Sequence, residues 1–133
     1  MPALSSAADV RAYAGSRLSG DAPDAWAAAA AALRHAALGV VGVDRLSESA
    51  MYQTRGRGAT VPGVALQPAP GGGAQADVAL VLDPTPGLST EAVARAAGQV
   101  LQATWQRLGD PPPLALRVHV VDLAHAQPGA RHA

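Results

Sequence analysis

The sequence predicts an α+β two-layer sandwich in which two main helices cover one face of a mixed sheet of four to five strands. Apolar residues recur at helical spacing in two segments, which start near Asp24 and at Ser89. Short runs rich in Val and Leu lie between these segments, and one more follows the second helix. The expected order is helix, four strands, helix and strand, plus a short N-terminal helix.

The length of 133 residues fits one domain of ordinary size. We expect residues 1–20 to form a short helix or a docking arm, because their helical spacing is loose and two glycines interrupt it. Residues 21–124 then form the single α+β domain. Residues 125–133 read as a polar C-terminal tail.

The composition excludes several classes of function. Ten basic residues balance ten acidic ones, so no net field would attract nucleic acid. Cysteine is absent, which excludes disulfides, thiolate catalysis and cysteine-based metal sites. Every basic residue apart from histidine is Arg, and Ala and Gly are abundant, which suggests a bacterial chain from a GC-rich genome.

The longest apolar window, residues 25–43, is weak as a membrane segment. It consists mostly of alanine and is interrupted by Arg34 and His35. The N-terminus shows no basic region followed by an apolar run, as a signal peptide would. We therefore expect a cytoplasmic protein with no direct membrane insertion.

The first strong helix has one apolar face and ends at Gly39, which we expect in a left-handed conformation. The run of alanines at 27–32 favours the helix, and their small side chains permit close packing. The apolar face repeats at spacings of four, three and four. Its members are Trp26, Ala30, Leu33 and Ala37.

The middle of the chain predicts a twisted antiparallel meander of short strands at 40–46, 51–54 and 60–66. Pro62 cannot donate a hydrogen bond to a neighbouring strand, so its segment belongs at an edge or a bulge. Residues 67–74 contain three glycines and two prolines and are expected to form a flexible hairpin loop.

The strand at 77–83, the helix at 89–108 and the strand at 114–123 form a closing unit. The two strands are expected to run parallel, side by side or one position apart, through a right-handed crossover. Ser89 caps the helix, and its stripe comprises Val93, Ala97, Val100, Thr104 and Leu108, widened by Leu101 and Trp105. The inward residues are Val78, Leu80 and Leu82 on the first strand and Leu114, Leu116, Val118 and Val120 on the last.

Titratable side chains gather near the end of the last strand, at His119, Asp122 and His125. On a regular strand, His119 and Asp122 point to opposite faces, which argues against shared ligation of a metal. We therefore expect no metal site, no cofactor and no catalytic residue, and the chain is not expected to be an enzyme.

Two arginines in a glycine-rich turn, Arg55 and Arg57, could grip a phosphate or carboxylate. An alternative function is therefore a small-molecule anion-binding domain, or an enzyme subunit, with the ligand between this turn and residues 71–73. A weaker alternative is RNA binding through an outward sheet face that carries Arg117 and His119. These four residues are the expected ligand or partner contacts.

Three segments carry a resemblance to a known family. LRHAALGVVGVDRL at 33–46, VPGVAL at 61–66 and LRVHVVDL at 116–123 resemble the helix-into-strand opening, the next Gly-Val strand and the closing strand of the alkaline shock (envelope stress-response) protein family of Gram-positive bacteria. The likeness covers residues 25–123.

The resemblance implies a small, cytoplasmic, non-catalytic protein that self-associates or binds a membrane-anchored protein partner during envelope stress. It brings no catalytic residue, cofactor or metal ligand. The function expected from the sequence is accordingly that of a protein-interaction or assembly module.

Overall fold

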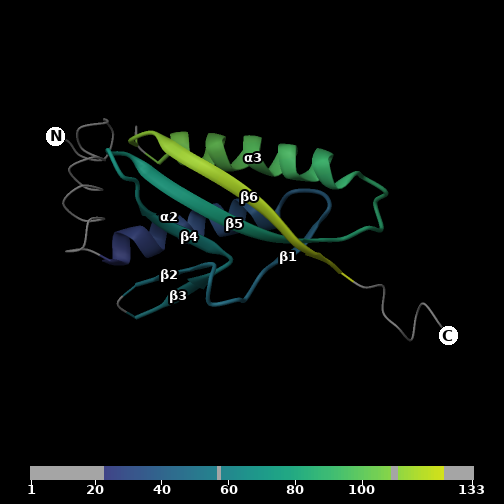
Figure 1. The fold of residues 1–133 in the computed structure, drawn as a ribbon, viewed down its shortest axis with the longest axis horizontal. Helices are drawn as coiled ribbons and strands as arrows, with labels where there is room; N and C mark the ends of the chain where they lie inside the picture. The colour runs from purple at the N-terminus through teal and green to yellow at the C-terminus, as the bar shows by residue number, and fades with distance from the viewer. Residues whose placement is uncertain (1–22, 57, 109–110, 125–133) are drawn as a thin grey trace.

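The computed structural model describes residues 23–56, 58–108 and 111–124 (Figure 1). Its two helices and mixed strands confirm the predicted α+β two-layer sandwich, with both helices on one face of the main sheet. The predicted N-terminal arm of residues 1–20 and the tail of residues 125–133 lie outside the described residues. The elements are α2 (Pro23–Leu38), β1 (Val43–Leu46), β2 (Gln53–Arg55), β3 (Thr60–Pro62), β4 (Val64–Pro68), β5 (Ala74–Leu82), α3 (Thr90–Gln106) and β6 (Leu114–Leu123).

Strand β5 is the centre of the main sheet. Along one edge it pairs in parallel with β6 over its whole length. Its other edge is shared by two antiparallel strands, β4 beside the first half and β1 beside the last three residues. The strands that flank α3 therefore lie side by side. The sequence had also allowed them to lie one position apart.

The predicted antiparallel meander is confirmed for the pairing of β2 with β3 and wrong for the pairing of β1. β1 pairs with β5, which is distant in the sequence, while β2 and β3 form a separate two-stranded hairpin. The break occurs at Gly63, which has a φ of 88° and divides the predicted strand 60–66 into β3 and β4. Its N–H donates to the Tyr52 carbonyl at 2.6 Å, and its own carbonyl accepts from Ala79 N–H at 3.0 Å. The chain thus changes pairing partner at this glycine.

Thr54 connects the hairpin to the main sheet. Its side chain is 5% exposed, and its hydroxyl donates to the Val64 carbonyl at 2.6 Å. The same oxygen accepts from Leu66 N–H at 2.9 Å. One buried side chain therefore satisfies two backbone groups on β4 and fixes β2 beside it.

Helix α2 buries the predicted face, and its end differs from the prediction. The chain leaves the helix through short-range bonds of Gly39 N–H and Val40 N–H to the carbonyls of Ala36 and Ala37. The left-handed residue is Gly42, with a φ of 98°, rather than Gly39. The residues of the predicted face, Trp26, Ala30, Leu33 and Ala37, are all buried.

Helix α3 begins as predicted, with the Ser89 hydroxyl accepting from Ala92 N–H at 3.0 Å. Its buried stripe is rotated from the predicted one, because Val100 is 38% exposed whereas Leu101 and Trp105 are buried. Trp105 Nε1 donates to the Pro112 carbonyl at 2.7 Å and so holds the connector to β6 against the helix. The buried residues of α3 are Val93, Ala97, Leu101 and Trp105.

The core lies between the helices and the inward row of β5. Ala76, Val78 and Leu80 are fully buried there and pack against both helices. The inward residues of β6 extend the same core, but only its first member, Leu114, is buried. Within the described residues, no helix has the length and apolar character needed to cross a membrane.

Candidate functional site

The open face of the sheet, opposite the helices, carries a compact polar cluster around Asp77. In the parallel register Asp77 on β5 lies beside Arg117 on β6. Arg117 Nε lies 3.2 Å from Asp77 Oδ1, and His119 Nε2 lies 2.8 Å from the same oxygen. The Asp77 side chain is 17% exposed, so this carboxylate is largely enclosed by its two partners. Two of the expected contact residues, Arg117 and His119, are thus brought together.

The position of His119 follows from both neighbours of its ring. An ionised carboxylate only accepts hydrogen bonds, so Nε2 carries the proton that faces Asp77. The Tyr52 ring also packs near the imidazole, with ring centroids 5.4 Å apart. This contact joins the loop before β2 to β6 across the open face and holds the imidazole in place.

A β-bulge in β6 changes the face that Asp122 occupies. Leu80 pairs with Val120, and the next residue of β5, Val81, pairs with Asp122 rather than with Val121. The extra residue reverses the alternation of the strand. Asp122 therefore lies on the same face as His119, and the predicted placement on opposite faces is wrong.

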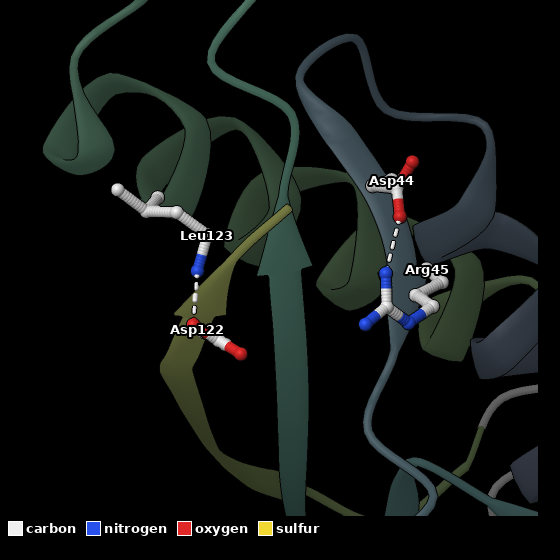
Figure 2. A network of polar contacts seen from close by, with 4 residues as sticks. All are labelled: Asp44, Arg45, Asp122 and Leu123. Atoms are coloured by element: carbon white, nitrogen blue, oxygen red, sulfur yellow. Dashed lines mark hydrogen bonds and ion pairs between the residues drawn. The ribbon is translucent and has the colours of Figure 1, made fainter. Parts of the chain in front are cut away.

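No metal centre accompanies this arrangement in the described part of the chain. His119 and Asp122 share a face, but no group of three potential ligands comes together among residues 23–56, 58–108 and 111–124. The third member of the sequence cluster, His125, lies outside the described residues. Asp122 Oδ1 instead accepts from Leu123 N–H at 2.8 Å, as Figure 2 shows.

A shallow concave surface of about 440 Å³ lies on the open face where β1, β5 and β6 end. Figure 2 shows Asp44 and Arg45 of β1 and Asp122 of β6 at this end, with Arg45 Nη1 2.7 Å from Asp44 Oδ2. Acidic side chains outnumber basic ones here, since Glu48 and Asp122 accompany one arginine. The lining residues are Arg45, Ser47, Glu48, Val81, Val121 and Asp122.

Asp83, at the end of β5, turns the chain toward α3. Its Oδ1 accepts from Thr85 N–H at 2.9 Å. The backbone and side-chain hydrogen bonds from Thr85 lower the pKa of the Asp83 carboxyl below its ordinary value of 3.8. This carboxylate has a local structural task and is not part of the Asp77 cluster.

The second edge of β6 carries no neighbouring strand within the described residues, where β6 pairs with β5 alone. At the start of this edge the Leu114 carbonyl accepts from Gln102 Nε2 of α3 at 3.2 Å. The inward residues along the edge are partly exposed: Leu116, Val118 and Val120. Toward the end of the strand, Val121 is 42% exposed and Leu123 is 47% exposed. We call this feature the β6 edge.

The predicted anion site between the arginine turn and the glycine loop is not assembled by the described contacts. Arg55 is exposed at the end of β2 and pairs with Thr60 in the hairpin. Gly73 instead packs beside Pro113, whose carbonyl accepts from Ala74 N–H at 2.9 Å, near the start of β6. Arg57 lies outside the described residues.

Sequence reasoning missed Asp77 as a site residue, although a signal was present. Asp77 precedes the predicted inward residue Val78 and so falls on the outward face, where Arg117 and His119 were also predicted. The two strands were predicted to run parallel. For these three side chains to meet, the two strands must also be adjacent and in register, and tertiary packing determines both. The position of Asp122 depends on the bulge, for which the sequence gives no marker.

Comparisons with models of known protein families, with curated proteins and with solved structures found no match for this chain.

Proposed function

We propose that this chain is a non-catalytic protein-interaction or assembly module, of the type that the alkaline shock family represents, acting in the bacterial cytoplasm. Its interaction element is the β6 edge, where another polypeptide adds a strand to the sheet. One observation carries this proposal: among the described residues, the ten-residue strand β6 has no second neighbouring strand, and its inward apolar row is partly exposed.

The physical basis is the cost of an unprotected edge. Backbone N–H and C=O groups on an exposed strand are a template for another strand, and soluble proteins usually block long edges with Pro, Lys or a covering segment. β6 contains no Pro, and its bulge lies near its end at Val121, so the regular part of the strand before it pairs with no second strand within the described residues. Strand addition supplies main-chain hydrogen bonds for affinity, and alternate side chains supply specificity.

The apolar row supplies the hydrophobic contribution. Val78 and Leu80 on β5 are fully buried, whereas their neighbours Val118 and Val120 on β6 remain partly exposed. A strand added at the β6 edge would place its own inward side chains beside these valines. Burial of this apolar area favours association, at about 25 cal/mol per Å² removed from water.

The open-face cluster supports an interaction module more than nucleic-acid binding. The charge of Arg117 is balanced locally by Asp77, and Asp122 adds negative charge to the same face. RNA affinity depends on several uncompensated basic groups. RNA binding remains the weaker alternative, and salt-dependent retention of the chain on RNA would favour it.

Affinity capture with a matched pair of variants tests the proposal. Val118→Lys places an ammonium on the β6 edge, whereas Val100→Lys introduces the same group at a 38% exposed site on α3. We expect wild type and V100K to retain the same protein partners from bacterial lysate, including a membrane-anchored one, and V118K to lose them. Equal retention by both variants, with V118K folded, would contradict a role for the edge.

The anion-binding alternative has its own test. Thermal shift with nucleotides and acidic metabolites would show stabilisation that Arg55→Gln abolishes if the arginine turn binds them. Lack of stabilisation at millimolar ligand would remove this alternative and leave the interaction module unaffected.

A further inference from the structure

The β6 strand carries a charge pattern that is complementary to itself. Arg117 and Asp122 both lie on the open face, because the bulge at Val121 brings Asp122 opposite Val81. In an antiparallel pair, the first half of one strand runs beside the second half of the other. A basic residue early in β6 and an acidic residue late in it therefore meet when two copies of the strand pair.

We infer that the occupant of the β6 edge is a second copy of this chain, paired antiparallel with the two-fold axis at His119. This inference rests on the proposed function and names its partner. In register with β5, Arg117 lies beside Asp77, His119 beside Ala79 and Asp122 beside Val81. Arg117 and Asp122 are therefore each two positions from His119, so each faces the other in the second copy.

The same axis matches the apolar residues of the inward face. Val118 and Val120 lie beside Val78 and Leu80, one position on either side of the axis. Val118 of one copy therefore faces Val120 of the other. Leu116 and Leu123 are three positions from the axis, so the 47% exposed Leu123 gains an apolar neighbour. One register thus pairs charge with charge and apolar with apolar side chains.

Arg117 is able to serve both contacts. It reaches Asp77 through Nε and its side chain remains 63% exposed. A guanidinium group has five N–H donors, so a second carboxylate can be bound without loss of the first. Arg117 would then lie between Asp77 of its own chain and Asp122 of the second copy. The two imidazoles at the axis each remain beside their own Asp77 carboxylate.

Cysteine cross-linking tests the inferred register, and the chain contains no native cysteine to interfere. Directly opposed residues in an antiparallel pair have Cα atoms about 4.5 to 5.5 Å apart, within the range of a disulfide. We expect His119→Cys in the full chain to form a disulfide dimer under mild oxidation. Arg117→Cys mixed with Asp122→Cys should form the mixed dimer in excess over either homodimer.

Ala115→Cys is the matched control, since Ala115 is exposed on the same strand and face. It lies beside Gln75, four positions from the axis, so its counterpart would be about 26 Å away at ~3.3 Å per position. We expect A115C to form no disulfide-linked dimer after oxidation, and thermal unfolding should show that each variant folds.

Two outcomes would overturn the inference: H119C that folds yet forms no disulfide dimer, or A115C that cross-links as readily as H119C. Either result would leave the proposed function standing, provided that V118K loses protein partners that V100K retains. Failure of that capture experiment would remove the proposed function itself.

Discussion

Asp77 on β5 and Arg117 on β6 lie side by side in the parallel register, with Arg117 Nε 3.2 Å from Asp77 Oδ1. The same carboxylate contacts His119 Nε2 at 2.8 Å. One acidic side chain thus fixes two side chains of the edge strand on the open face. The contact orders the part of β6 that we propose to meet another polypeptide.

Removing the charge of Asp77 should weaken the fold slightly. Asp77→Asn keeps the shape and an acceptor oxygen, but removes the negative charge that pairs with Arg117. Because Arg117 is 63% exposed, solvent screens its pair, and we expect a loss of about 1 kcal/mol in the free energy of unfolding. Urea denaturation measures this value. Asp44→Asn is the control, since the Asp44 side chain is 38% exposed, against 17% for Asp77, and its pair with Arg45 should contribute almost nothing.

Much of the fold was predictable because local signals determined it. Ser89 caps α3 as predicted, and β6 has its predicted limits of Leu114 and Leu123. Alternation along β5 correctly placed Asp77 outward. Each of these features depends on side chains within a few residues of one another.

The rest depended on contacts between distant segments. At Gly63 the chain changes its hydrogen-bonding partner. Its N–H donates to the Tyr52 carbonyl just before β2, and its carbonyl accepts from Ala79 N–H on β5. The bulge near Val121 is visible only in the register between β5 and β6. Neither Gly63 nor Val121 stands in a sequence pattern that distinguishes these roles from an ordinary turn or strand residue. The open-face cluster was therefore missed although its members were correctly oriented.

Thr54 should be essential to the junction between the hairpin and the main sheet. Thr54→Val retains the shape but leaves the Val64 carbonyl and the Leu66 N–H without their hydroxyl partner. We expect a loss of about 2 to 4 kcal/mol in the free energy of unfolding, measured by chemical denaturation. Thr54→Ser keeps the hydroxyl and should cost only about 1 kcal/mol for the lost methyl group. Equal losses in the two variants would show that these hydrogen bonds are unimportant.

Gly63 should not tolerate a side chain. Its φ of 88° disfavours L-residues, and an added Cβ would overlap the Leu46 side chain. We expect Gly63→Ala to lower the free energy of unfolding by at least about 2 kcal/mol. Gly98→Ala is the opposite case, because Gly98 lies within α3 and a Cβ there would meet no atom within 4 Å. That variant should gain about 0.5 to 1 kcal/mol. A neutral G63A would refute the role assigned to this turn.

The Asp83 carboxyl should contribute to acid sensitivity. Hydrogen bonds from Thr85 lower its pKa in the folded chain, so the ionised form favours folding above the unfolded-state pKa, near 3.8. This contribution is lost as the pH falls below that value through the lowered pKa of the folded state. In urea denaturation at pH 2 to 5, the difference between wild type and Asp83→Asn should therefore shrink toward the acid end. A difference that is constant with pH would show that the Thr85 contacts do not favour the ionised carboxylate.

Sedimentation velocity of the full chain tests most directly whether the β6 edge pairs with a second copy of the chain. We expect wild type to sediment with twice the mass of one chain at micromolar concentration, V100K to do the same, and V118K to sediment as a folded monomer. A wild-type chain that stays monomeric at all concentrations, or a V118K variant that dimerises as wild type does, would contradict self-association through the β6 edge.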